Sequence, residues 1–160
     1  MPQEWQRKVR VVSEGSEYLV LEYLMCRNIR VRKARPGNQG YDLLCGHPQR
    51  RTEKQLRIQV KSRSQLPNDG SVPLSKRTID GFDYLVAVFL NITRKNPTVS
   101  LEFCTVPRQW VREHHEQYRS GCGKVFLKKK GMEAEMASFK NDRGFEKIAR
   151  ELRVPSPALY

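Results

Sequence analysis

Apolar residues near the start of the chain recur at intervals of three and four positions. In the stretch GSEYLVLEYLMCRN (residues 15–28), Leu21, Leu24 and their apolar neighbours share one face when the segment is wound as a helix. Ser13 or Ser16 can cap the start of such a helix, because a serine hydroxyl accepts a hydrogen bond from a free N–H of the first turn. The pattern predicts an amphipathic helix that packs on a core through one face.

Three short stretches that follow have the composition and spacing of strands. They are IRVRKA (29–34), YDLLCG (41–46) and LRIQVKS (56–62). A Pro/Gly/Asn turn at 35–40 separates the first two, and a polar, basic connection at 47–55 joins the second to the third. We expect the second and third strands to pair as a hairpin.

The middle of the chain continues with further strand patterns. We expect a loop over LPNDGSVP (66–73), a short helix over LSKRTIDGF (74–82), and strands over DYLVAVFL (83–90) and TVSLEFCTV (98–106). DYLVAVFL is the most apolar run in the chain, so it predicts a central strand that is buried on both faces of a sheet.

Helical patterns prevail in the last third of the chain. PRQWVREHHEQYRS (107–120) starts with proline at a favourable first helical position, and residues 133–154 predict two helical pieces broken near Asn141–Gly144. The order of elements predicts an α/β fold in which a mixed sheet is flanked by helices. We expect the 160 residues to form one domain, with a core at about 13–105 and a helical C-terminal extension at about 107–155.

Two C-terminal segments admit more than one interpretation. KVFLKKK (124–130) is either a basic grip on DNA or an exposed strand protected by its lysines. In GFEKIARELRV (144–154), Phe145, Ile148 and neighbouring apolar residues form one helical face. This face either docks on the core or meets a second copy of the chain.

The charge of the chain is strongly positive and unevenly distributed. Lysine and arginine total 30 against 17 acidic residues, which gives a net charge of +13 and a pI near 9.9. Residues 27–63 alone hold eleven basic and two acidic residues. This excess favours a polyanionic partner, either nucleic acid or an acidic membrane surface.

The signals for membrane insertion, secretion and disulfide bonding are missing from the sequence. No apolar run approaches the roughly 18 residues that a membrane span needs, and the N-terminus lacks the apolar core of a signal peptide. Cys26, Cys45, Cys104 and Cys122 are scattered and form no Cys-x-x-Cys pair, so we expect reduced thiols. These observations predict a cytoplasmic protein with no membrane partner.

Polar and charged residues interrupt the apolar strand patterns in two places. Asp42 lies within YDLLCG, and Gln59 and Lys61 lie within LRIQVKS. If the two strands pair, Asp42 lies beside Gln59 and Lys61, which share one face because they are two residues apart. A helix packed on that face can bring Glu17 into the same pocket. The expected group comprises two carboxylates, an amide carbonyl and an ammonium beside a basic surface.

Such a group suits metal-dependent hydrolysis of phosphodiesters. Carboxylate and carbonyl oxygens are ligands for Mg²⁺, which keeps several waters and binds phosphate oxygens. The metal activates a water, and a nearby lysine orients that water or stabilises negative charge. A plainer interpretation also stays open, in which Asp42 and Lys61 are exposed strand-edge charges and Glu17 is a helix acid favoured by the helix dipole.

These stretches resemble the PD-(D/E)xK, or restriction-endonuclease-like, nuclease superfamily. Over about residues 13–90 the chain is similar to its small members, which include archaeal Holliday-junction resolvases and short homing or restriction endonuclease domains. The resemblance implies that Glu17 is the first-helix glutamate and Asp42 the metal-binding aspartate. It also implies that Gln59-Val60-Lys61 stands for the Glu-x-Lys motif, with the Val60 carbonyl completing the metal shell.

The chain departs from the family pattern at Gln59, where glutamate is usual. Glutamine ligates through a neutral oxygen, so the affinity for metal drops unless Glu17 compensates. Glu14, one helical turn earlier, is a second candidate for the role of Glu17.

The expected function is that of a DNA endonuclease that uses Mg²⁺, with Mn²⁺ as a substitute. Two alternatives stay open: a DNA-binding protein of the same fold that has lost activity, and a basic RNA-binding accessory protein. Cleavage of both strands of a duplex needs two active sites, so we expect a homodimer or higher homo-oligomer. The basic residues expected to contact DNA phosphates are Lys33, Arg35, Arg50, Arg51, Arg57, Arg63, Lys76 and Arg77.

Overall fold

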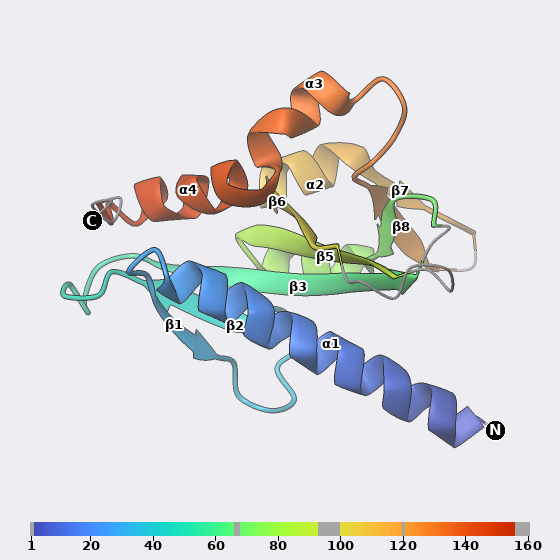
Figure 1. The fold of residues 1–160 in the computed structure, drawn as a ribbon, viewed down its shortest axis with the longest axis horizontal. Coiled ribbons are helices and arrows are strands. Elements are labelled where there is room, and N and C mark those ends of the chain that lie inside the picture. Colours follow the sequence, from blue (N-terminus) through green and yellow to red (C-terminus); the bar gives the residue numbers. More distant parts are fainter. Residues whose placement is uncertain (1, 66–67, 93–99, 120, 156–160) are drawn as a thin grey trace.

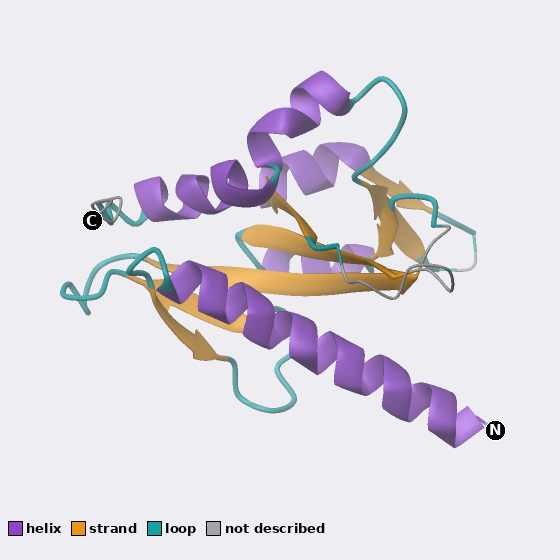
Figure 2. Cartoon of the chain, viewed as in Figure 1, coloured by secondary structure: helices purple, strands orange, loops and turns teal. Residues whose placement is uncertain are grey.

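A computed structural model describes residues 2–65, 68–92, 100–119 and 121–155 of the chain. Its strands form two sheets, with helices around them (Figure 2). The larger sheet consists of β1 (Arg30–Lys33), β2 (Leu43–Gly46), β3 (Gln55–Gln65), β5 (Tyr84–Ile92) and β6 (Glu102–Pro107), in the order β1-β2-β3-β5-β6. Strands β3 and β5 are parallel, and the other neighbours are antiparallel. The predicted α/β class and the predicted hairpin, β2–β3, are confirmed.

A long helix, α1 (Pro2–Met25), opens the chain and lies across the larger sheet (Figure 1). The predicted start at Ser13 or Ser16 is wrong, because both serines lie inside the helix. The hydroxyl of Ser16 donates to the carbonyl oxygen of Val12, one turn earlier, at 2.9 Å. A serine that satisfies its hydroxyl in this way can lie within a helix and need not begin it.

Two apolar cores lie on opposite faces of the larger sheet. The first contains residues of α1, among them Val20 and Leu24, and residues of α4 (Asn141–Glu151). The second lies under η1 (Lys76–Gly81), α2 (Arg108–His114) and a small sheet of β4 (Ser71–Pro73), β8 (Gly123–Phe126) and β7 (His115–Gln117), in the order β4-β8-β7. Each core has its own layer of covering elements.

Strand β5 belongs to both cores, as its sequence predicts. Val86 and Val88 point into the first core, Leu85 and Ala87 point into the second, and all four are fully buried. A strand that is covered on both faces reads as a continuous apolar run, because neither face meets water.

The small sheet corrects three sequence predictions. The loop expected at 66–73 contains β4, and the helix expected at 107–120 ends at His114, after which the chain forms β7. Strand β8 is the middle strand of this sheet, with Val125 fully buried, so it is not the exposed strand that KVFLKKK suggested. These strands have three or four residues each, and their stability depends on tertiary packing, which local sequence reports poorly.

The C-terminal helices are broken as predicted, one position earlier than expected. After α3 (Glu133–Met136) and η2 (Ala137–Phe139), Lys140 is extended and pairs with Cys104 in an isolated bridge. The face of α4 that carries Phe145 is buried in the first core, and its ring packs against Tyr23. This apolar face therefore docks on the sheet. No helix in the described ranges is long and apolar enough to cross a membrane.

Candidate active site

The polar residues singled out in the sequence meet where the hairpin of β1 and β2 ends beside β3. Strand β1 ends at Lys33, which faces Leu43, the first residue of β2. Leu43 in turn faces Ile58. Along the edge of β3 that β2 occupies, no described strand pairs with the residues after Ile58. The sheet therefore has a notch beyond Ile58, and Asp42 lies at its corner.

The carboxylate of Asp42 is anchored to β3 by two hydrogen bonds. Its Oδ2 accepts from the backbone N–H of Val60 at 2.7 Å and from Nε2 of Gln59 at 2.6 Å. The Asp42 backbone N–H donates to the carbonyl oxygen of Ile58 at 2.8 Å. The hairpin register that the sequence predicts therefore brings Asp42 and Gln59 together.

The electrostatic surroundings of Asp42 show which other charges lie close to it. Its pKa is raised, chiefly because the carboxyl group is buried, and the hydrogen bond from Val60 acts against this rise. The negative charge of Glu17 raises the pKa further, whereas Lys61 and Lys33 lower it. Two carboxylates and two ammonium groups thus surround one position at the notch.

Helix α1 does not pack on the face that the sequence analysis expected. Ile58 and Val60 point into the core beneath α1, so Gln59 and Lys61, which alternate with them, point to the opposite face. The prediction that α1 covers the face of Gln59 is wrong, because residue spacing alone does not tell which face a helix covers. Glu17 instead lies at the end of the hairpin, where β1 and β2 stop.

Glu17 is held there by Lys33. The Lys33 ammonium lies 3.1 Å from Oε2 of Glu17 and 3.9 Å from Oε1 of Glu14, and it stacks over the Tyr18 ring. Burial acts to lower the pKa of Lys33, but the hydrogen bond and charge of Glu17 outweigh this effect and raise it. The side chain of Glu17 is 20% exposed against 57% for Glu14, which favours Glu17 as the residue of the site.

The loop before Asp42 is fixed by a close backbone contact. A Cβ added to Gly81, the last residue of η1, would lie 2.6 Å from Cα of Gly40. Only glycine permits this approach, because any side chain there would overlap the opposite backbone. The contact ties the second layer of the fold to the segment that positions Asp42.

The eight residues expected to contact DNA fall into two groups. Four have ion-pair partners: Lys33 with Glu17, Arg50 with Glu53, Arg57 with Asp83, and Arg63 with Asp69. The other four have no such partner in the described part of the chain, and they are Arg35, Arg51, Lys76 and Arg77. Two further arginines without an ion-pair partner in the described residues, Arg30 and Arg32, were not among the eight, although their alternation with Ile29 and Val31 places both on one strand face.

The donor atoms at the notch suit a hard divalent cation. Glu17, Asp42 and Gln59 offer oxygen ligands from side chains, and the Val60 carbonyl offers one from the backbone. Across the residues that the structure describes, no cluster of three or more His, Cys, Asp or Glu residues could hold a metal. The Gln59 amide donates from Nε2 to Asp42, so its oxygen would lie beside that carboxylate only if the amide turned over.

Comparisons with known proteins bear on the fold. The sequence matches no protein-family model and no curated protein sequence. The structure is similar to that of a bacterial homing endonuclease, I-Ssp6803I, with a TM-score of 0.53 and 16% sequence identity over 88% of this chain and 91% of the other. It is also similar to a Holliday junction resolvase from Archaeoglobus fulgidus, with a TM-score of 0.45 and 16% identity over 71% and 83% of the two chains. The likeness to I-Ssp6803I and the mixed sheet flanked by helices show a restriction-endonuclease-like fold, as the resemblance of the sequence implies.

Proposed function

We propose that the protein is a metal-dependent DNA endonuclease that hydrolyses phosphodiester bonds. The observation that carries the proposal is the Asp42 carboxylate, which Val60 and Gln59 hold within electrostatic reach of Glu17 and Lys61. I-Ssp6803I, which has the same fold, is a homing endonuclease. The net charge of +13 supports DNA as the partner.

The oxygen donors of the site suit Mg²⁺, with Mn²⁺ as a substitute. Glu17 and Asp42 would supply carboxylates, and Gln59 and the Val60 carbonyl would complete the set. When bound, Mg²⁺ activates a water and offsets the charge of the attacked phosphate. Because Gln59 contributes no charge, Glu17 is essential to the neutralisation of the cation.

Lys61 is the residue proposed to assist the attacking water. It shares a strand face with Gln59, and in the described part of the chain it forms no ion pair. Its positive charge lowers the pKa of Asp42, and this influence supports a role for Lys61 beside that carboxylate. From there it can orient the water or stabilise the negative charge that develops on the phosphate.

Lys33 has a different role, because its ammonium already forms an ion pair with Glu17. The ion pair of 3.1 Å balances a carboxylate that would otherwise repel Asp42. If Glu17 and Asp42 held a divalent cation, its charge would balance Glu17 in place of Lys33, and the Lys33 ammonium could then bind a phosphate oxygen.

Cleavage of both strands requires two copies of this centre, so we propose that the active form is a homodimer or higher homo-oligomer. Size-exclusion chromatography with light scattering, with and without duplex DNA, measures the number of copies directly. A monomer in both conditions contradicts this part of the proposal.

A second candidate is a DNA-binding protein of the same fold that does not cleave. The observation in its favour is the side-chain amide of Gln59. The amide donates a hydrogen bond to one oxygen of Asp42, and it carries no negative charge that could attract a metal ion. The two candidates differ in their response to Mg²⁺, because only the enzyme needs the cation for its effect on DNA.

Incubation of the purified protein with supercoiled plasmid and with branched DNA tests the proposal. We expect nicking or resolution with Mg²⁺ or Mn²⁺, none with EDTA, and loss of cleavage in Asp42→Ala and Lys61→Ala. Glu146→Ala and Arg143→Ala, which change exposed residues of the same charge signs outside the site, serve as matched controls and keep the activity. DNA binding without cleavage of either substrate, under every metal condition, favours the second candidate.

A further inference from the structure

The basic residues of the chain differ in whether an acid neutralises them. Arg27, Arg57, Arg63 and most described lysines form ion pairs with nearby carboxylates. Four arginines on and beside the β1–β2 hairpin have side chains with no ion pair or hydrogen bond within the described residues, and they are Arg30, Arg32, Arg35 and Arg51. Their positive charge is available to a partner.

Strand register places Arg30 and Arg32 on the face that carries Gln59 and Lys61. Arg30 faces Gly46, which faces Gln55, and Arg32 faces Leu44, which faces Arg57. The next row in the same direction contains Asp42 and Gln59. Rows on one face are two residues apart, or roughly 7 Å, so the row of Arg30 lies roughly 14 Å from that of Asp42.

Two adjoining hollows follow these rows. The first, of about 240 Å³, is lined by Arg30, Arg32, Leu44, Gly46, Arg51 and Gln55. The second, of about 370 Å³, shares Arg32 with the first and extends past Arg35 to Lys33 and Tyr41, the residue before Asp42. No acidic residue lines either hollow. We call the two together the arginine groove.

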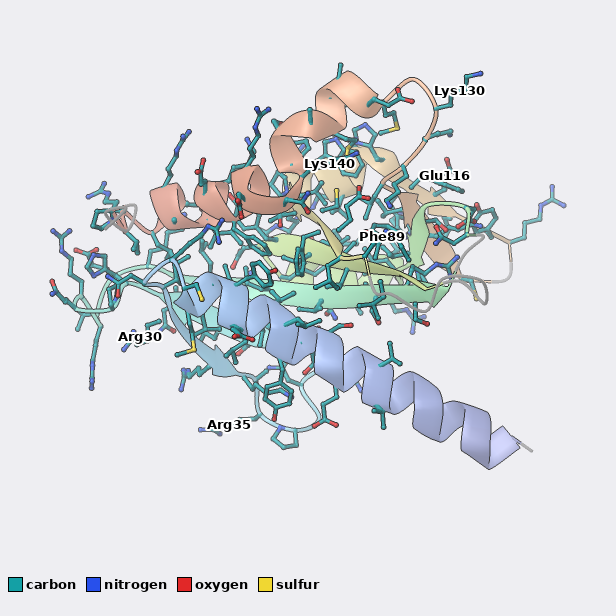
Figure 3. The ribbon with its side chains drawn as sticks, viewed as in Figure 1. Arg30, Arg35, Phe89, Glu116, Lys130 and Lys140 are labelled. Atoms are coloured by element: carbon teal, nitrogen blue, oxygen red, sulfur yellow. The ribbon has the colours of Figure 1, made fainter. Side chains whose placement is uncertain are left out.

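Gly46 makes room for one of the arginines. A Cβ added to Gly46 would lie 3.1 Å from a terminal nitrogen of Arg30. The guanidinium of Arg30 therefore lies over the backbone of β2, at a place where a side chain would displace it. Figure 3 shows Arg30 and Arg35 on the same side of the molecule, and Lys130 lies on the opposite side.

We propose that the arginine groove binds the sugar–phosphate backbone of duplex DNA that flanks the cleaved bond. This inference rests on the proposed function and names the surface that holds its substrate. Unpaired guanidinium groups bind phosphates without first giving up a carboxylate, and they form paired hydrogen bonds to phosphate oxygens. A span of roughly 14 Å corresponds to roughly four base pairs at 3.4 Å each.

The composition of the groove favours a duplex over a single strand. Proteins that hold single strands stack the bases on exposed aromatic rings. Tyr41 is the one aromatic residue that lines the two hollows, and it packs against the second core. The groove thus offers charge for a backbone and little surface for an unpaired base.

Binding measured without divalent metal separates this inference from the proposed cleavage. Fluorescence anisotropy with a labelled duplex in EDTA, at several salt concentrations, compares Arg30→Gln/Arg32→Gln with the charge-matched control Arg143→Gln/Arg153→Gln. Both control residues are exposed and lie outside the groove. We expect roughly tenfold weaker binding only in the groove variant, with a salt dependence lower by about two counterions.

Three results overturn the inference: unchanged binding in the groove variant, equal losses in both variants, or tighter binding of single-stranded RNA than of the duplex. Arg51→Gln, in an exposed turn, gives a second reading that does not depend on a change in β1, and we expect it to weaken binding in the same direction. If the groove variant binds weakly but the native protein never nicks DNA, the groove stands and the proposed cleavage fails.

Discussion

Asp42 and Asp83 each accept a backbone N–H of strand β3, but their pKa values are shifted in opposite directions. Asp42 precedes β2 and accepts the N–H of Val60 at 2.7 Å, and Asp83 precedes β5 and accepts the N–H of Arg57 at 2.8 Å. Burial raises the pKa of Asp42. Burial acts in the same sense on Asp83, but the hydrogen bonds and charge of Arg57 outweigh it and lower the pKa.

The difference separates a structural carboxylate from one that is available for chemistry. Asp83 has both oxygens bonded to the Arg57 guanidinium and lies 3.7 Å from Arg108. Asp42 has no cation in ion-pair contact among the described residues, and its nearest charged neighbours act on it from further away. A neutralised carboxylate stabilises the fold, whereas a carboxylate that lacks a counter-ion can bind one.

The largest expected effect is the loss of nuclease activity when Asp42 is replaced. Asp42→Asn keeps an oxygen that accepts the Val60 N–H but removes the charge that binds the cation. We expect metal-dependent nicking to fall by about a hundredfold or more. The melting temperature should stay equal or rise, because the buried charge is unfavourable to folding. Plasmid nicking and thermal melting measure the two quantities, and a variant that melts earlier and still nicks contradicts the comparison.

Asp83→Asn should give the reverse result. It breaks the ion pair with Arg57 and leaves that guanidinium with a neutral neighbour, which destabilises the fold by about 1–3 kcal/mol. Nicking at a temperature where the variant is folded should be near the native rate. Urea denaturation measures the free energy of unfolding. If the free energy of unfolding of this variant equals that of the native protein, Asp83 does not stabilise the fold as argued.

Gln59→Glu increases the negative charge around Asp42 and so enlarges its difference from Asp83. It places a second carboxylate at the 2.6 Å contact with Asp42, and like charges at this distance destabilise the protein in EDTA by about 1–2 kcal/mol. Added Mg²⁺ should raise the melting temperature of the variant more than that of the native protein. Gln55→Glu, on the same strand face but away from Asp42, is the matched control and should show neither effect.

The smallest expected effect is a change in the free energy of unfolding at acidic pH. Because the folded protein lowers the pKa of Asp83, this carboxylate stabilises the fold above its ordinary pKa of about 3.9, and the contribution is lost as the pH falls through the folded value. The difference in unfolding free energy between the native protein and Asp83→Asn should therefore be constant near neutral pH and shrink below about pH 4. Urea titrations at several pH values measure it, and a difference that grows in acid has the wrong sign.

The sequence was most informative where a residue's position depends on local spacing. Alternation in β2 and β3 predicts their hairpin, and the hairpin register brings Asp42 to Gln59. The apolar run of β5 predicts a strand buried on both faces, because burial and composition are directly linked.

Other features depend on contacts between distant segments, and the sequence did not predict them. The face covered by α1 is decided by which core Val20 and Leu24 join, and helical periodicity does not contain that information. The partner of Lys33 was likewise hidden, because Glu17 lies on another element. Asp83 looked like an ordinary strand start, and its pairing with Arg57 follows only from the parallel arrangement of β3 and β5.

The turn between β2 and β3 has a consequence for how such a protein can diversify. It carries Arg51 and lies at the end of the hairpin away from Asp42. Exposed loop tips tolerate insertions and substitutions far better than the strands that support them. If the arginine groove holds DNA as proposed, changes of length or sequence in this turn can alter how DNA is held while Asp42 and Gln59 stay unchanged. Variants of the chain could then acquire new DNA preferences and keep the proposed active site intact at every step.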